Sequence, residues 1–355
     1  MNTEQNNSPN NDQQEIDDDS ETSSDEIPEG TIVGNFEIIE MIGEGGYGDI
    51  YEVKDPQTEI HYAMKIEYLD AEKRGINTEI KIMKELQSSH SFPTFIDSGK
   101  FDDFKYLVME LLGPSLSLLR RSVPSKKLSS YTYLTLGSSM VNCLRDMHKL
   151  GYIHRDVKPG NFLIRAEKKD PICLIDFGLS RQYIDPETGF HKPPRDDPGY
   201  TGTVRYASLH AHDEMELSRR DDMISWFYSM VELAKGKLPW PGSDNKEETI
   251  RLKRTLTVEE ICTGMPQEFI PIYRHISMLG YEDTPDYELI ILYLNQALSK
   301  ENTSKTVLDW EKLNSEEIQE ISSIPLTTKE DEPKKKETSN NASGSEGKGG
   351  CCTIC

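Results

Sequence analysis

The chain has 355 residues and a formal net charge of −22, and this length can hold one large domain or two small ones. The acidic balance argues against a nucleic-acid partner, because nucleic-acid binding needs a basic face. No run of about 18 apolar residues and no basic-then-apolar amino terminus occurs, so neither a transmembrane helix nor a signal peptide is expected.

The first 30 residues are predicted to form an acidic, disordered tail. Residues 1–29 contain ten Asp or Glu and no Lys or Arg, in a background of Asn, Gln and Ser. Such a segment cannot bury enough apolar surface to offset the entropy that ordering costs.

Residues 31–112 predict a small, sheet-rich lobe. Apolar or alternating stretches favour antiparallel strands at Phe36–Ile42, Ile50–Val53, Tyr62–Ile66 and Tyr106–Met109. Between the last two, Glu72–Gln87 carries apolar residues at helical spacing, so one amphipathic helix is expected.

Residues 113–312 predict a larger lobe in which helical patterns dominate, so the expected fold class is α+β with two lobes. From residue 313 the chain turns polar, and residues 313–355 are predicted to be a second disordered tail. Three cysteines stand singly among apolar neighbours, which predicts buried, reduced thiols at Cys143, Cys173 and Cys262.

A glycine-rich turn follows the first long strand. Gly43-Glu44-Gly45-Gly46-Tyr47-Gly48 has the spacing G-x-G-x-x-G, which occurs both in dinucleotide-binding folds and over the ATP phosphates of kinases. A dinucleotide-binding fold would continue into a helix, whereas Asp49–Val53 alternates like a strand. The pattern therefore favours a loop folded over ATP phosphates, where glycine lets backbone amides approach the ligand.

A single lysine, Lys65, stands in the apolar strand Tyr62–Ile66. By itself it fits a surface lysine at an alternating position equally well. Buried beside the glycine turn, it would need a phosphate partner and a carboxylate to hold it. Glu79 on the following helix is the best-placed carboxylate, ahead of Glu72 and Glu85.

The segment His154-Arg155-Asp156-Val157-Lys158-Pro159-Gly160-Asn161 carries the groups that phosphoryl transfer needs. The carboxylate of Asp156 can accept the proton of an attacking hydroxyl, and Lys158 can lie against the transferring phosphate. The amide of Asn161 can hold a metal ion. The run has the form H-R-D-x-x-x-x-N, the catalytic-loop pattern of protein kinases.

Asp176-Phe177-Gly178 follows the short apolar strand Ile172–Ile175. Mg²⁺ prefers hard oxygen ligands and keeps several waters, so Asp176, Asn161 and nucleotide phosphates would suffice to bind it. A single D-F-G fits an ordinary turn at a strand end. Four motifs in this order and at these separations are far more specific.

The order of glycine loop, strand lysine, H-R-D loop and D-F-G resembles the eukaryotic protein kinase family over about residues 31–300. The resemblance implies a two-lobed protein kinase fold that binds Mg²⁺ and ATP in its cleft, and Lys158 indicates a serine/threonine kinase. Met109 would be the gatekeeper, Glu110–Leu112 the hinge, and Asp222 the helix residue that braces the catalytic loop. The residues implied to bind ATP are Ile42, Gly43, Gly45, Gly46, Gly48, Ile50, Ala63, Lys65, Glu79, Met109, Glu110, Leu112 and Leu163.

Further motifs resemble the casein kinase 1 superfamily and, within it, the tau-tubulin kinase branch. Leu112–Leu116 and Thr203–Ser208, which stands in place of an A-P-E motif, carry the first resemblance. Three stretches carry the second: Lys192–Arg195, Gly202–Ser208 and Asp309–Glu311. The stretch Ser208–His210 departs from the Ser-Ile-Asn or Ser-Val-Asn common in the superfamily.

Three basic residues, Lys192, Arg195 and Arg205, fall in the segment that would face a protein substrate. Each can be an ordinary solvated or structural charge. Together they predict recognition of acidic or phosphorylated regions around Ser/Thr, because guanidinium groups pair bidentately with phosphate. The superfamily resemblance agrees. The same segment offers three hydroxyls for phosphorylation: Tyr200, Thr201 and Thr203.

The carboxyl terminus is rich in cysteine. The sequence ends Cys351-Cys352-Thr353-Ile354-Cys355. Its last four residues fit C-a-a-X loosely, and the ending also resembles the double-cysteine tails of Rab-type small GTPases. Lipidation of Cys351 or Cys352 is one interpretation, and an unmodified cysteine tail is the other. Two lipid chains would anchor the protein firmly to a membrane, whereas one would hold it marginally.

The leading interpretation is a monomeric, cytoplasmic serine/threonine kinase that acts on protein substrates and reaches membranes only through its tail. The alternative is a catalytically silent scaffold with a kinase fold, held at membranes by lipid. The intact set Lys65, Asp156, Asn161 and Asp176 favours the enzyme.

Overall fold

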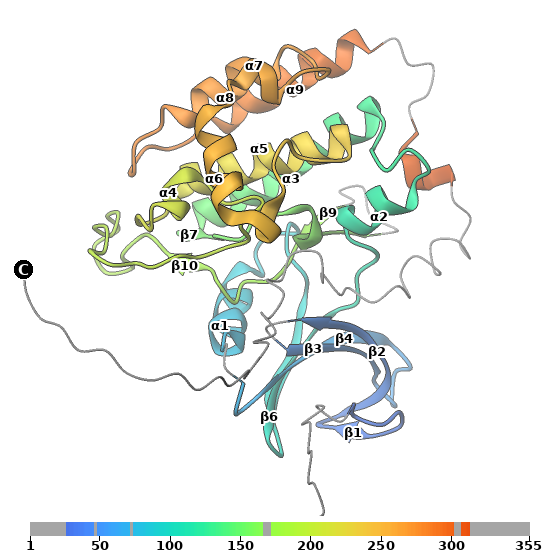
Figure 1. The fold of residues 1–355 in the computed structure, drawn as a ribbon. Helices are drawn as coiled ribbons and strands as arrows, with labels where there is room; N and C mark the ends of the chain where they lie inside the picture. The colour runs from blue at the N-terminus through green and yellow to red at the C-terminus, as the bar shows by residue number, and fades with distance from the viewer. Residues whose placement is uncertain (1–25, 46–47, 72–73, 166–171, 302–306, 313–355) are drawn as a thin grey trace, which may run out of the picture.

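The computed structural model describes residues 26–45, 48–71, 74–165, 172–301 and 307–312, which form a sheet-rich and a helical lobe (Figure 1). The smaller lobe contains a six-stranded antiparallel sheet with strand order β1-β2-β3-β4-β6-β5. Its strands are β1 (Ile32–Val33), β2 (Phe36–Gly45), β3 (Gly48–Lys54), β4 (His61–Tyr68), β5 (Phe95–Phe101) and β6 (Phe104–Glu110).

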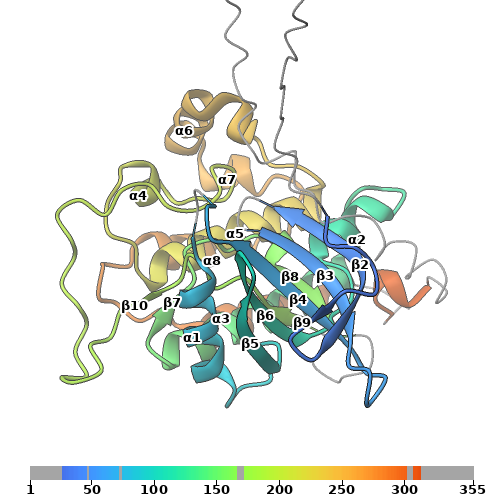
Figure 2. The same ribbon diagram turned by 90° about the horizontal axis from the view of Figure 1, so that it is seen from below.

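The sheet buries both of its faces. Alternate residues such as Tyr51 and Val53 of β3 pack into one apolar cluster with Met64 and Val108. The opposite face, including Leu107, joins the main core and packs against helix α1 (Ile76–Leu86), which contacts β5 and β6. Figure 2 shows α1 beside the sheet. The four strands predicted from the sequence and the α+β class are confirmed.

Helix α1 begins at Ile76, later than the predicted start at Glu72. Its first free backbone amides are capped from β4, because the buried carboxylate of Glu67 accepts from the amides of Gly75 (2.5 Å) and Ile76 (2.9 Å). A carboxylate satisfies amides that have no partner inside a helix and interacts favourably with the positive end of the helix dipole. The cap comes from the preceding strand, eight residues before Gly75, so the residues next to the helix start carry no capping signal.

Strand β5 was missed in the sequence because Asp97, Ser98 and Gly99 interrupt its apolar pattern. The glycine is required by packing, since a Cβ at Gly99 would lie 2.5 Å from the hydroxyl oxygen of Tyr106 on the paired strand β6. Pairing with β6 therefore makes a strand of a segment with weak strand propensity.

The larger lobe is mainly helical, as predicted. Its helices are α2 (Leu116–Ser122), α3 (Ser130–Lys149), α4 (Leu209–His212), α5 (Arg219–Lys235), α6 (Lys246–Thr255), α7 (Val258–Ile261), α8 (Phe269–Ser277) and α9 (Tyr287–Lys300), with short 3₁₀ turns at Pro159–Asn161, Gly242–Asn245 and Asp309–Lys312. Helices α3 and α5 pack closely at Gly137 of α3. A Cβ on that glycine would lie only 2.6 Å from the terminal methyl carbon of Met230 on α5. Figure 1 shows both helices in the middle of the lobe.

Two small antiparallel pairs lie where the lobes meet. Strand β7 (Tyr152–Ile153) pairs with β10 (Arg181–Gln182), and β8 (Phe162–Ile164) pairs with β9 (Ile172–Leu174). These pairs fix the loops after β7 and β9, which contain the predicted catalytic and metal-binding residues.

Within the described ranges, no helix has the length and apolar character needed to cross a membrane. Cys143, Cys173 and Cys262 are buried and not disulfide-bonded, as predicted. The predicted tails, residues 1–30 and 313–355, lie almost wholly outside the described residues.

Candidate active site

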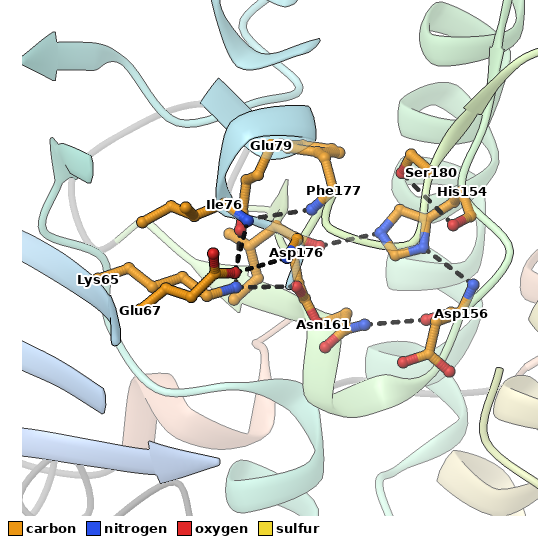
Figure 3. Close-up of polar contacts among 12 residues, drawn as sticks. Lys65, Glu67, Ile76, Glu79, His154, Asp156, Asn161, Asp176, Phe177 and Ser180 are labelled. Atoms are coloured by element: carbon orange, nitrogen blue, oxygen red, sulfur yellow. Dashed lines mark hydrogen bonds and ion pairs between the residues drawn. The ribbon is translucent and has the colours of Figure 1, made fainter. Parts of the chain in front are cut away.

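Three charged residues from distant segments meet in the cleft. The Nζ atom of Lys65 on β4 lies 2.7 Å from Oε2 of Glu79 on α1 and 3.1 Å from Oδ1 of Asp176 (Figure 3). Lys65 is 7% exposed and Glu79 1% exposed. Burial opposes the ammonium charge, but Asp176 and Glu79 outweigh it and raise the pKa of Lys65.

The carboxyl of Asp176 is held in its ionised form. Burial would raise its pKa, but attraction to Lys65, Lys158 and His154 outweighs burial and lowers the pKa to about 2. The pKa of Glu79 is raised, mainly by burial, although Lys65 opposes that change. The buried ammonium thus holds two carboxylates whose pKa values shift in opposite directions, that of Glu79 upward and that of Asp176 downward.

The position of Asp176 is set by its backbone. Its φ of 68° lies in the left-handed region, which non-glycine residues rarely adopt. The next amide, of Phe177, donates to Oε1 of Glu79 at 3.2 Å, and Phe177 is fully buried. The surroundings therefore hold a strained turn, as is common where a functional carboxylate must point in one direction.

An apolar cavity of about 300 Å³ lies between β2, β3, β6 and β8. This is at the lower end of the volumes typical of small-molecule sites. Seven of the residues implied to bind ATP line it: Ile42, Ile50, Ala63, Met109, Glu110, Leu112 and Leu163. Leu111, within the predicted hinge Glu110–Leu112, also lines the cavity. Ile175 lines it as well and was not predicted, because it is marked only by its place before Asp176.

The rim of this cavity is anchored through Glu110. Its Oε1 and Oε2 atoms lie 2.8 Å from Nε and Nη2 of Arg165, a bidentate ion pair. Arg165 is buried and also donates to the carbonyl oxygens of His90 and Phe92. The hinge segment is thereby fixed to Arg165, the residue directly after β8 in the larger lobe.

The glycine turn closes the β2–β3 hairpin, with Gly43 opposite Ile50 and Gly45 opposite Gly48. Gly48 has a φ of 115°, and a Cβ there would lie 1.8 Å from the carbonyl oxygen of Ile66, so glycine is required. Gly46 lies outside the described residues. Because a strand follows the turn, the dinucleotide-binding alternative is ruled out.

Asp156 is positioned by Thr203 and Lys158. Its Oδ1 accepts from the backbone amide (2.8 Å) and the hydroxyl (2.7 Å) of Thr203, while Nζ of Lys158 lies 2.9 Å from its Oδ2. Lys158 also donates to the hydroxyl of Thr203 at 3.2 Å. In the sequence, Thr203 was noted as part of the motif Thr203–Ser208 and as a candidate phosphorylation site, and not as a partner of Asp156. Its hydroxyl instead helps to orient the predicted catalytic carboxylate.

The backbone of the catalytic loop is supported by Asp222 of α5. Its carboxylate accepts from the amides of His154 (2.7 Å) and Arg155 (2.8 Å), and it lies 2.8 Å from Nε2 of His148. Arg155 has a φ of 68°. The contacts are those expected of a bracing aspartate, and they stabilise a left-handed residue beside Asp156.

The ring of His154 links the two loops, as Figure 3 shows. Its Nε2 lies 2.9 Å from the carbonyl oxygen of Ile175, and its Nδ1 accepts from the amide of Asp156 at 3.2 Å. The proton therefore belongs on Nε2. This arrangement holds the loop with Asp156 against the segment with Asp176.

The residues present fit a magnesium ion. The side-chain nitrogen of Asn161 donates to the carbonyl oxygen of Asp156 at 2.9 Å, which leaves the amide oxygen of Asn161 as the atom for a metal. The amide of Ile175 donates to the carbonyl of Asn161 at 3.0 Å and brings Asn161 next to Asp176. A carboxylate and an amide oxygen are hard ligands of the kind Mg²⁺ prefers.

The predicted substrate residues are only partly available. Arg195 binds Glu216 through Nε (2.5 Å) and Nη2 (3.0 Å), and Nη1 of Arg205 lies 3.4 Å from Oε1 of Glu232. Lys192 makes no ion pair with any residue that the structure describes. Cys351 and Cys352 lie outside the described residues.

Comparisons with known proteins agree with this geometry. The sequence model of the protein kinase domain matches residues 36–341. A probable serine/threonine-protein kinase of Dictyostelium discoideum is 37% identical over 283 residues, which make up 79% of this chain and 57% of that protein. The serine/threonine-protein kinase spe-6 of Caenorhabditis elegans is 32% identical over 295 residues, 80% of this chain and 77% of that kinase.

Proposed function

This chain belongs to the protein kinase family, and from that premise we propose that it transfers the γ-phosphoryl group of Mg-ATP to Ser or Thr hydroxyls of proteins. The observation that carries the proposal is the joint placement of Asp156, Lys158 and Thr203 beside Asn161 and Asp176. A silent scaffold needs none of these contacts.

Asp156 orients the acceptor hydroxyl and takes its proton. Thr203 occupies Oδ1 of Asp156 with two hydrogen bonds, so Oδ2 faces the acceptor together with the ammonium of Lys158. Lys158 offsets the negative charge that develops on the transferred group. Most of the acceleration in such a site comes from positioning and electrostatics.

The nucleotide and its metal would be held by residues already in place. The apolar cavity takes the adenine, Lys65 binds phosphate oxygens, and Asp176 with Asn161 binds the metal. Bound Mg²⁺ supplies charge neutralisation on the phosphates. The pair with Glu79 keeps the Lys65 ammonium in position before the nucleotide arrives.

We propose acidic or phosphorylated regions of proteins as the preferred substrates, in keeping with the resemblance to the casein kinase 1 superfamily and the tau-tubulin kinase branch. Lys192 supports this, since it makes no ion pair within the described residues, although, after hydrogen bonds from two backbone amides, its charge helps to lower the pKa of Asp185. Arg195 and Arg205 would have to exchange an internal carboxylate for that of the substrate, because Glu216 and Glu232 hold them in the free chain.

The test is phosphorylation of a Ser/Thr peptide library that contains acidic, phosphorylated and neutral members, with Mg-ATP. We expect the acidic and phosphorylated members to have the highest kcat/KM. Lys192→Glu and Arg205→Glu should raise KM for acidic peptides more than for neutral ones. Equal effects on both classes would contradict the substrate preference, and a wild-type chain that phosphorylates no member would contradict the kinase activity.

A further inference from the structure

Tyr200 lies in a segment that is pressed against the catalytic loop. Two residues after it, Gly202 has a φ of 102°, and a Cβ there would lie 2.6 Å from the carbonyl oxygen of Arg155 and 3.7 Å from Oδ1 of Asp156. The next residue, Thr203, binds Asp156 directly. Tyr200 therefore lies three residues before Thr203, in a segment that contacts the carboxylate expected to bind the acceptor hydroxyl.

The ring of Tyr200 contacts His212 and Lys246. It stacks on the ring of His212, with centroids 5.8 Å apart and planes inclined by 24°. The Nζ atom of Lys246, the first residue of α6, lies 4.4 Å from the ring centroid. The ring also packs against the apolar cluster that contains Ala207 and Ala211. A side chain held in this way cannot easily turn its hydroxyl elsewhere.

The hydroxyl of Tyr200 has no hydrogen-bond partner among the described residues, although its oxygen is buried. Burial, and after it the charge of Asp156, raises the pKa of this phenol, so it stays protonated and can donate. A buried donor without a partner costs about 1–3 kcal/mol, which a ligand that supplies an acceptor would recover.

Lys246 offers a second donor at the same place. Its side chain is exposed, and its ammonium makes no ion pair with any residue in the described ranges. The nearby charges are mixed. Burial and then the charges of Lys253, Lys246 and Arg254 lower the pKa of His212 to about 3. The carboxylate of Asp156, in contrast, acts on the Tyr200 hydroxyl. A carboxylate is the ligand group that a hydroxyl donor and an ammonium favour where such cations offset one carboxylate.

We infer that Tyr200 and Lys246 form a specificity subsite, which binds a carboxylate side chain on the substrate residue adjacent to the phosphoacceptor. This rests on the proposed kinase function and adds to it a position and a pair of binding residues distinct from Lys192, Arg195 and Arg205. The Tyr200 hydroxyl donates to one carboxylate oxygen, and the Lys246 ammonium attracts the other.

The test uses the full chain and matched serine peptides with Asp or the isosteric Asn immediately before or immediately after the serine. We expect the wild type to prefer Asp at one of these positions. Tyr200→Phe removes only the hydroxyl, keeps the stack on His212, and should lower the Asp/Asn ratio of kcat/KM about fivefold to tenfold. Lys246→Met should lower the Asp/Asn ratio by a smaller factor, about threefold, because Lys246 is exposed. Lys246→Arg keeps the positive charge and should keep the wild-type ratio.

Two control variants separate recognition from general damage. Tyr293→Phe on α9, a helix that Figure 1 shows at the end of the larger lobe away from the sheet, and Lys100→Ala, exposed on β5, should leave the Asp/Asn ratio and KM for ATP unchanged. An active wild type with no preference for Asp at either position, or an unchanged ratio in Tyr200→Phe, overturns this inference alone. A wild type that phosphorylates no peptide overturns the proposed function, and this inference with it.

Discussion

The carboxylate of Glu216 holds the guanidinium of Arg195, with Oε2 at 2.5 Å from Nε and Oε1 at 3.0 Å from Nη2. Glu216 is 5% exposed, and its Oε1 also lies 3.6 Å from Nε of Arg181. Burial and repulsion from Arg195 and Arg181 lower the pKa of the nearby Arg155 to about 10. One buried carboxylate therefore keeps cationic groups of three segments together beside the catalytic loop.

Replacing Glu216 by Gln should destabilise the chain and impair catalysis. The cationic side chains would lose their buried counter-charge, so we expect a loss of about 2–3 kcal/mol in the free energy of unfolding, since Arg195 and Arg181 are partly exposed. The kcat/KM for peptide phosphorylation should fall by a larger factor than the affinity for ATP. Urea unfolding and steady-state kinetics measure both effects.

The control is Glu248→Gln, which breaks an exposed pair with Arg251 on α6. Such an exposed pair is screened by solvent and contributes little to stability. A Glu248 variant that is as unstable as the Glu216 variant would contradict the importance of burial at Glu216.

Asp156→Asn should lower kcat by about 10²–10⁴, the usual contribution of a general base. The amide can still accept from the backbone of Thr203, so the loop should keep its shape, and Kd for Mg-ATP should stay near the wild-type value. Single-turnover kinetics and nucleotide titration measure these quantities. Near-normal turnover in the variant would refute the role of Asp156.

Gly202→Ala should disturb catalysis through the backbone. Its methyl group would meet the carbonyl oxygen of Arg155 at 2.6 Å, so the segment must move and withdraw Thr203 from Asp156. We expect a fall in kcat of about tenfold or more, because sub-ångström placement controls such sites. Gly264→Ala is the matched control, since Gly264 also has a positive φ but nothing within 4 Å of its Cβ position. It should cost about 1 kcal/mol in stability and leave kcat unchanged.

His212 should make stability depend on pH. Burial and the charges of Lys253, Lys246 and Arg254 lower its pKa in the folded chain to about 3, against about 6.5 when unfolded. Between these values the unfolded chain binds a proton that the folded chain does not, so stability falls as pH falls below 6.5. His212→Gln should reduce the slope of unfolding free energy against pH by about 1 kcal/mol per unit between pH 6 and 4. Unfolding at several pH values checks this, and parallel slopes would contradict it.

Membrane attachment through Cys351 and Cys352 stays a prediction. Detergent partitioning of the whole chain, expressed in a eukaryotic host, can be compared with a variant that lacks residues 351–355. We expect only the whole chain to enter the detergent phase, strongly if two lipids are attached and weakly if one is. Identical partitioning would rule out lipidation in that host.

Most of the active site could be predicted because its residues occur in short motifs with fixed spacing. Three segments are each recognisable from neighbouring residues alone: the strand with Lys65, the loop with Asp156 and the turn at Asp176. The structure brings them into one cleft. Thr203 and Glu216 were not recognised as positioning residues, because each acts on a residue more than 20 positions away. Neither Thr nor Glu has a local pattern that marks such a contact.

The sequence by itself determined the family and the two-lobed class, and it marked the residues proposed to perform phosphoryl transfer, since these depend on residue type and local spacing. Only the tertiary structure decided which charges remain free for substrates. Arg195 and Arg205 are bound by Glu216 and Glu232, whereas Tyr200 has a buried hydroxyl without a partner among the described residues. Charge pairing and burial depend on distances between segments far apart in the chain, which local spacing does not specify.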